Sequence, residues 1–179
     1  LAASAFFFGA AQAAVVVYYP LLLITKFDIS QALVQRSFSS LGLGYLIGAI
    51  AVGFLPHRYT TDALMTMSAS IGIAGVWLCV VSPNLLSASL GGFLFGLWNG
   101  SMISLLLDRI NQSSEAQHAR VTWSRFSIIL SLGFTISISC LSPISNNNVV
   151  MIVWIGLWLT FIHLSCQAMS RYLFSLRTP

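Results

Sequence analysis

The chain has 179 residues, of which 57% are hydrophobic and only 7% are charged. A soluble globular domain carries about 25% charged residues, so this composition excludes a protein whose whole surface faces water. The net charge of +4 comes from lysines and arginines that fall in loops and at the ends of apolar stretches, which argues against nucleic acid as a partner. The three cysteines lie in apolar stretches without metal-site spacing, so no metal is expected.

The apolar residues form continuous stretches of roughly 20 residues, which is the length of one helical crossing of a bilayer. An outer-membrane β-barrel would instead alternate apolar and polar residues. We therefore predict an all-α polytopic membrane protein, in which residues 1–179 form a single six-helix transmembrane bundle. The expected spans are residues 1–24, 31–55, 62–82, 85–107, 121–143 and 149–169.

The first expected span carries a glutamine, Gln12, near its middle. Polar groups inside the bilayer are costly, so they tend to be paired or kept for a function. Gln12 is therefore a candidate contact for a solute in a central cavity. The alternative is a hydrogen bond to a neighbouring helix.

The second expected span combines a charge with a pair of glycines. Arg36 lies in its first turns, where the side chain could reach the outer surface or attract an anionic substrate. Gly44 and Gly48 lie four residues apart and so share one helix face. Because helices in lipid associate through close backbone contact, we expect this face to pack against another helix.

The fourth expected span repeats this spacing with Gly92, Gly96 and Gly100, which predicts a second small-residue packing groove. It also holds Trp98 and Asn99 near its middle. Asn99 is a candidate either for a helix-to-helix hydrogen bond or for contact with a solute in the cavity. Trp98 is a further cavity candidate, with packing as its alternative.

The sixth expected span contains a lone histidine, His163. Such a histidine is either hydrogen-bonded to a neighbouring helix or titrates near neutral pH and relays protons. The expected spans contain no carboxylate in their interior that could share the proton, since Asp62 is the first residue of the third span. His163 completes the set of candidate cavity residues.

The basic residues are distributed unevenly between the two sides of the expected bundle. Lys26 and Arg36 fall on one side, and all the others fall on the opposite side. Those others are Arg58, Arg109, Arg120, Arg125, Arg171 and Arg177. Since lysine and arginine concentrate in cytoplasmic loops, we predict that both termini are cytoplasmic, in a membrane such as the bacterial inner membrane.

Two stretches of this chain resemble the major facilitator superfamily. GFLPHRYTTD (residues 53–62) is similar to the loop motif G-x-x-x-D-[RK]-x-G-[RK]-[RK] of that family. Gly53 and Arg58 match the motif, and His57 stands where the family has its acid. GFLFGLWNG (residues 92–100) resembles the glycine-spaced fourth helix, which in the family often ends in an acid, as Asp108 does here. The chain resembles one six-helix half of such a transporter, and the N-terminal half more than the other.

The resemblance implies a secondary transporter in which two six-helix halves surround a central cavity. A small-molecule solute would then cross the bilayer by alternating access, and no cofactor is implied. The partners would be the lipid bilayer, the solute, and either a second six-helix half or a second copy of this chain. The resemblance also implies a contact between Asp108 and Arg58 at the cytoplasmic face.

Two other functions stay open. The chain could be a six-helix substrate-binding subunit of a vitamin importer, docking on separate ATPases, with Ala10 and Ala14 as a docking face. It could also be an integral membrane protein that transports nothing. An enzyme is not expected, because Ser101 and His163 lack the flanking glycine pattern of an intramembrane serine protease and no P-loop occurs.

Overall fold

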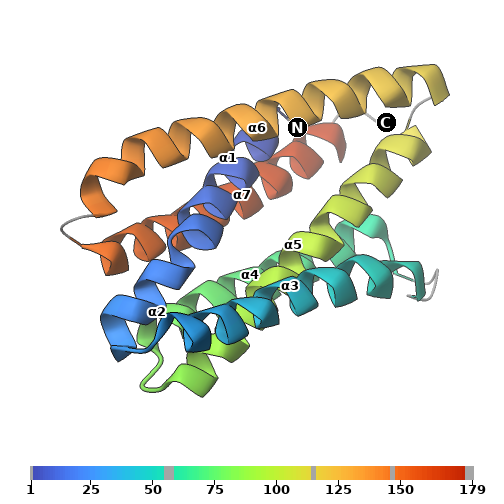
Figure 1. The fold of residues 1–179 in the computed structure, drawn as a ribbon. Coiled ribbons are helices and arrows are strands. Elements are labelled where there is room, and N and C mark those ends of the chain that lie inside the picture. The colour runs from blue at the N-terminus through green and yellow to red at the C-terminus, as the bar shows by residue number, and fades with distance from the viewer. Residues whose placement is uncertain (1, 55–58, 114–115, 146–147, 176–179) are drawn as a thin grey trace.

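The computed structural model describes residues 2–54, 59–113, 116–145 and 148–175, with the backbone alone for residues 113, 116–117 and 170–175. Every regular element in this part of the chain is a helix (Figure 1). The elements are α1 (Ala2–Gln12), the π-helical turn η1 (Ala13–Val17), α2 (Tyr19–Phe27), α3 (Gln31–Phe54), α4 (Thr61–Val81), α5 (Leu85–Ser113), α6 (Ala116–Ser145) and α7 (Val149–Ser175).

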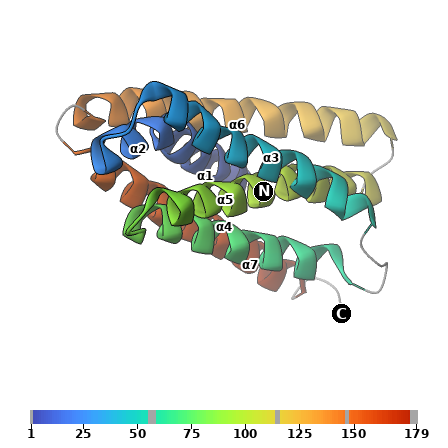
Figure 2. The same cartoon turned by 60° about the horizontal axis from the view of Figure 1, so that its bottom comes forward.

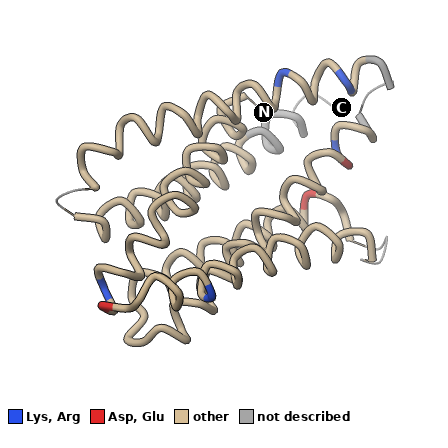
Figure 3. Tube along the Cα trace, in the orientation of Figure 1, with Lys and Arg blue, Asp and Glu red and all other residues tan. Residues whose placement is uncertain are grey.

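Within the described residues, six helices are long and apolar enough to cross a membrane. The elements α1, η1 and α2 join into one span, Ala2–Phe27, and each of α3 to α7 provides another. This confirms the predicted fold class, an all-α bundle of six membrane-spanning helices. The described charged residues lie towards the two ends of the bundle (Figure 3), as expected when the middle of each span faces hydrocarbon.

Polar side chains at the turns begin several of the helices. Thr60 accepts a hydrogen bond from the backbone N–H of Ala63 at 3.2 Å and so caps α4. Asn84 does the same for α5 through the N–H of Ser87, and Asn148 for α7 through the N–H of Met151. Such caps satisfy N–H groups that have no partner within the helix. This explains why the three helices begin directly after these polar residues.

The six spans form two groups of three (Figures 1 and 2). In one group α5 packs against both α3 and α4, and in the other α1 packs against both α6 and α7. The two groups meet where α4 packs against α7, with smaller contacts from α2 to α5 and from α5 to α6. The buried core runs along this meeting surface and includes Phe8, Phe95 and Trp98, all fully buried.

The pattern of packing is unchanged when the first three spans are exchanged with the last three. Under this exchange the α3–α5 contact becomes the α6–α1 contact, the α4–α5 contact becomes the α7–α1 contact, and α4–α7 maps onto itself. Because neighbouring spans run in opposite directions and the shift is by three spans, the two units cross the bundle in opposite directions. The bundle is therefore an inverted repeat of two three-span units.

The exchange is also visible in the sequence. FFFGAAQ (residues 6–12) in the first span aligns with FLFGLWN (residues 93–99) in the fourth. LGLGYLIG (residues 41–48) in the second span aligns with LSLGFTIS (residues 130–137) in the fifth. The repeat was not among the features predicted from the sequence.

The aligned glycines occupy equivalent contacts in the two groups of helices, α1 with α6 and α5 with α3. A Cβ on Gly9 would lie 2.0 Å from the carbonyl oxygen of Leu130, and a Cβ on Gly96 would lie 2.0 Å from that of Leu41. Leu130 and Leu41 are themselves aligned in the repeat. No side chain fits at such distances, so glycine allows two helix backbones to touch at each of these places.

The remaining predicted packing glycines also lie at helix contacts. A Cβ on Gly44 or Gly48 would meet the backbone of α5 at 2.1 or 2.2 Å, and one on Gly100 would meet the backbone of α3 at 2.0 Å. Gly92 faces the ring of Tyr19, whose hydroxyl oxygen would lie 2.7 Å from the added Cβ. Four of the five glycines thus form the α3–α5 contact, and the fifth receives a side chain from α2.

Candidate functional site: a buried polar centre

Two amide side chains meet where the two three-span units come together. Gln12, at the end of α1, donates a hydrogen bond from Nε2 to the Oδ1 atom of Asn99 on α5 at 2.6 Å. Gln12 is 9% exposed and Asn99 4%. These two residues occupy aligned positions in the repeat, so each unit contributes one amide to the same contact.

The first span departs from a regular α-helix directly after Gln12. Residues Ala13–Val17 form the π-helical turn η1, and α2 then starts at Tyr19 with Pro20 in its first turn. Proline lacks an N–H and disturbs the preceding turn, which suits a break at this place. Isolated π turns inside α-helices occur often at functional sites, and this one adjoins the amide pair.

A second polar group lies at Ser4, about two turns before Gln12 on α1. His163 on α7 has its Nδ1 atom 2.9 Å from the carbonyl oxygen of Ser4 and 3.1 Å from the Ser4 hydroxyl. Its Nε2 atom lies 2.9 Å from the amide nitrogen of Gln167. His163 is fully buried, so this network ties α7 to the start of α1.

Aromatic rings connect the histidine network to the amide pair. The ring of Phe8 lies edge-on to that of Trp98, with centroids 5.0 Å apart, and 5.2 Å from the ring of His163. Trp98 directly precedes Asn99, and Phe8 lies one turn before Gln12. We call the set Ser4, Phe8, Gln12, Trp98, Asn99, His163 and Gln167 the polar centre.

Two atoms of the polar centre have no hydrogen-bond partner. Among the described buried side chains, these are Nε1 of Trp98, a donor, and Oε1 of Gln167, an acceptor. A buried polar atom without a partner is costly, so it calls for an explanation beyond packing. The polar centre therefore has one hydrogen-bond donor and one hydrogen-bond acceptor that are not used by the protein.

The repeat indicates that the fold does not require polar residues here. Ser4 aligns with Gly91 on α5, and a Cβ on Gly91 would lie 2.8 Å from the carbonyl oxygen of Gly75 on α4. The α4–α5 contact is therefore made through two glycines at the place where the equivalent α7–α1 contact has Ser4 and the histidine network. The polar groups are an addition to the packing scheme.

Four of the five predicted cavity candidates come together in the polar centre: Gln12, Trp98, Asn99 and His163. The fifth, Arg36, is exposed on α3 and does not join them. Sequence reasoning missed Ser4, Phe8 and Gln167. Gln167 could have been found, because it lies one turn after His163 and shares its helix face.

The loop-motif residues that the structure describes, Gly53 and Asp108, lie towards the C-terminal ends of α3 and α5. Arg58 falls outside the described residues, so the contact implied between Arg58 and Asp108 does too. Asp108 accepts hydrogen bonds from the Thr61 hydroxyl at 3.2 Å and from the Gln112 amide at 2.8 Å. A Cβ on Gly53 would meet nothing within 4 Å.

An ion pair joins α4 and α5 at this end. Arg109 Nη1 lies 2.7 Å from Asp62 Oδ1. The pair links the first turn of α4 to the C-terminal part of α5. It is a different pair from the contact of Asp108 with Arg58 that the resemblance implied.

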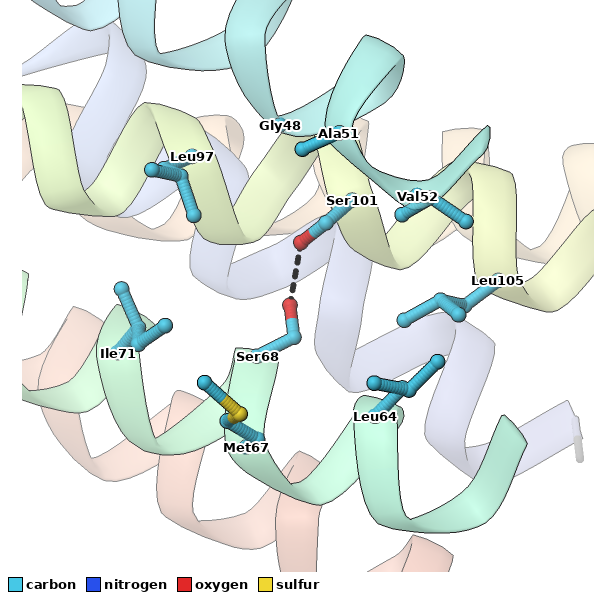
Figure 4. A pocket seen from close by; sticks show the side chains of 10 residues that line it. All are labelled: Gly48, Ala51, Val52, Leu64, Met67, Ser68, Ile71, Leu97, Ser101 and Leu105. Atoms are coloured by element: carbon cyan, nitrogen blue, oxygen red, sulfur yellow. Dashed lines mark hydrogen bonds between the residues drawn. The ribbon is translucent and has the colours of Figure 1, made fainter. Parts of the chain in front are cut away.

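A separate apolar groove of about 170 Å³ opens between α3, α4 and α5 (Figure 4). Its polar floor is the hydrogen-bonded pair of Ser68 and Ser101. The other lining residues are apolar or glycine: Gly48, Ala51, Val52, Leu64, Met67, Ile71, Leu97 and Leu105. The two hydroxyls satisfy each other, so the groove offers little polar recognition.

Comparisons with protein-family models, with curated proteins and with solved structures find no match to this chain. A functional assignment therefore depends on the inverted repeat and on the polar centre at the junction of its units. The described residues contain no cluster of histidine, cysteine or acidic side chains that could hold a metal ion.

Proposed function

We propose that this chain is one six-helix half of a secondary transporter of the major facilitator type, and that it moves a small solute across a membrane by alternating access. The observation that carries the proposal is the inverted repeat of three-span units with the Gln12–Asn99 pair at their junction. Transporters of this class contain inverted three-span repeats in each half and bind substrate near the bilayer midplane.

The arrangement of the centre supports this role in two further ways. The π turn η1 interrupts the first span next to Gln12, and interrupted helices are typical of transporter binding sites. The Gln12–Asn99 pair also lies midway along its spans, at a depth where polar groups are rare unless they serve a function.

In this mechanism the six helices rock as a bundle against a second bundle, which is a second half or a second copy of the chain. The backbone contacts at Gly44, Gly48, Gly96 and Gly100 keep α3 and α5 together. The first and fourth spans, which supply Gln12 and Asn99, face the solute. We place both termini in the cytoplasm of a bacterium, following the distribution of basic residues.

The test is a screen of purified protein for solutes that raise its melting temperature, followed by uptake of each such solute into proteoliposomes. We expect at least one small solute to stabilise the parent protein and to be taken up. Asn99→Leu should abolish both effects, and Asn111→Leu, a change at an exposed position on the same helix, should leave them unchanged.

Size determination in detergent belongs to the same test, since uptake by purified chain alone requires a second copy. Uptake without any dependence on Asn99, or stabilisation and uptake by no solute in a broad metabolite library, would contradict the proposal. The second outcome favours a membrane protein that does not transport.

A further inference from the structure

We infer that the solute bound at the polar centre is uncharged and carries both a hydrogen-bond donor and an acceptor. The inference rests on the proposed function and adds the substrate class. It follows from the position of the charges, from the protonation state of His163, and from the hydrogen-bonding capacity of the centre.

The described charged residues lie towards the two ends of the bundle (Figure 3). The hydrogen-bond partners within the centre are amides, a hydroxyl, an imidazole, a thioether and backbone oxygen, with no ionised group among them. A charged solute would have to leave water without meeting an opposite charge, and an unpaired buried ion is strongly disfavoured. The centre therefore selects against ions.

The contacts of His163 assign it as the neutral imidazole. Its Nδ1 atom lies 2.9 Å from the carbonyl oxygen of Ser4, which can only accept, so Nδ1 carries a proton. Its Nε2 atom lies 2.9 Å from the amide nitrogen of Gln167, which donates, so Nε2 carries none. The same amide nitrogen reaches the sulfur of Met102, a weak acceptor, at 3.4 Å, which agrees with this orientation of the amide.

The amide pair can exchange its own bond for bonds to a solute. The Gln12–Asn99 bond uses one donor and one acceptor, and a solute that presents an acceptor to Gln12 and a donor to Asn99 replaces it without leaving either group unpaired. The unpartnered donor of Trp98 and acceptor of Gln167 provide a second pair of the same kind. A small solute that carries both a hydrogen-bond donor and a hydrogen-bond acceptor can therefore bond to the polar groups of the centre.

The features that would suit other ligands lie elsewhere. Arg36 could attract an anion, but it is exposed on the second turn of α3. The groove at Ser68 and Ser101 is apolar, and its two hydroxyls already bond each other. Neither contributes to recognition at the polar centre.

The test uses matched pairs of solutes that differ by one charge, measured by stabilisation and by uptake into proteoliposomes. Suitable pairs are a hexose with its uronate and its amino sugar, a nucleoside with its monophosphate, nicotinamide with nicotinate, and glycerol with glycerol phosphate. For each pair of solutes that binds, we expect the dissociation constant of the uncharged member to be lower by about tenfold or more.

Preference for a charged member would overturn the inference while leaving transport in place. Binding of no solute from either side of any pair, nor from the broad library, would instead overturn the proposed function. The two failures are therefore distinguishable.

A pair of variants tests the location. Asn99→Asp introduces a carboxylate into the centre and should weaken the uncharged solute about tenfold or more, whereas Asn111→Asp on the exposed end of α5 should leave binding within about twofold. Arg36→Gln should also have no effect. If Asn99→Asp does not fold, Asn99→Ser keeps a donor and an acceptor and should retain part of the binding. Loss of binding in Arg36→Gln, with Asn99→Ser unchanged, contradicts the inference.

Discussion

Gln12 and Asn99 are single residues that join the two halves of the inverted repeat. Each is buried, and each has its amide satisfied by the other at 2.6 Å. In hydrocarbon a hydrogen bond between helices contributes about 1 kcal/mol, while an amide that loses its partner carries a penalty of about 1–3 kcal/mol. Removing the second amide should therefore cost less stability than removing the first, because no buried amide is then left without its partner.

We expect Gln12→Leu and Asn99→Leu each to lower the free energy of unfolding by about 1–3 kcal/mol, because each leaves one buried amide without its partner. The double variant should be more stable than the sum of the two losses predicts, by about 1 kcal/mol. Unfolding in mixed detergent micelles measures all four proteins of this cycle. Strict additivity would show that the two amides do not depend on each other.

At the residue scale, the sequence was informative where a polar group stood alone in an apolar stretch. Gln12, Asn99 and His163 were predicted on that ground, and the structure places them together. Their partners could not be predicted, because a hydrogen bond between residues such as Ser4 and His163 depends on which helices are neighbours. Arg36 was singled out by its charge alone, and charge near a helix end does not determine depth.

At the scale of the helix, glycine positions decide how closely two spans approach. Gly96 and Gly44 bring the backbones of α3 and α5 into contact, and the aligned Gly9 and Gly133 do the same for α1 and α6. Gly42 lies on the same helix as Gly44, yet a Cβ there would meet nothing within 4 Å. Spacing alone therefore does not identify a packing glycine.

We expect Gly96→Leu to destabilise the bundle by about 3 kcal/mol, because overpacking of a tight contact forces the two backbones apart. Gly42→Leu adds the same side chain to an open surface and should change stability by less than about 0.5 kcal/mol. Thermal unfolding in detergent compares the two. Equal behaviour of the two variants would mean that α3 and α5 do not touch at Gly96.

The ion pair between Asp62 and Arg109 is expected to contribute little to stability. The two side chains are 42% and 29% exposed, and pairs exposed to solvent contribute at most about 1 kcal/mol. Arg109→Gln should therefore shift the free energy of unfolding by no more than about 1 kcal/mol, and the shift should shrink at high salt. A larger loss that persists at high salt would indicate that the pair is a structural lock.

The existence of the helices followed from the length of the apolar stretches, because a bilayer fixes the length of a span. The π turn η1 did not, since Ala13–Val17 is apolar throughout and carries no local signal of a break. The ends of α5 and α6 also run past the expected spans into polar residues. Polar residues continue a helix readily outside the hydrocarbon, where water satisfies the side chains.

At the scale of the whole molecule, the two three-span units give the bundle its internal symmetry. The apolar stretches predicted that the chain crosses a membrane six times, but hydropathy does not indicate which spans pack against each other. The repeat was present in the sequence as two pairs of similar stretches, and comparing the first half of the chain with the second would have found it. Helix pairing then follows, because each stretch carries the glycine that meets its partner.

The topology predicts on which side of the membrane each turn lies. In a background without the three native cysteines, single cysteines at Asn84 and Asn148 should react with an impermeant reagent from one side. Cysteines at Tyr59 and Asn111 should react from the other side, which we predict to be cytoplasmic. Labelling of all four from the same side would be incompatible with six crossings.

The π-helical turn at Ala13–Val17 determines how many residues the first span needs. The aligned residues of α5 form an ordinary α-helix, so the first span accommodates one surplus residue. Gln12 before the turn bonds Asn99, and Tyr19 after it donates to the carbonyl of Ala88 at 2.9 Å. Removing the surplus residue would rotate one anchor by about 100° relative to the other, so a shortened span could keep only one of them.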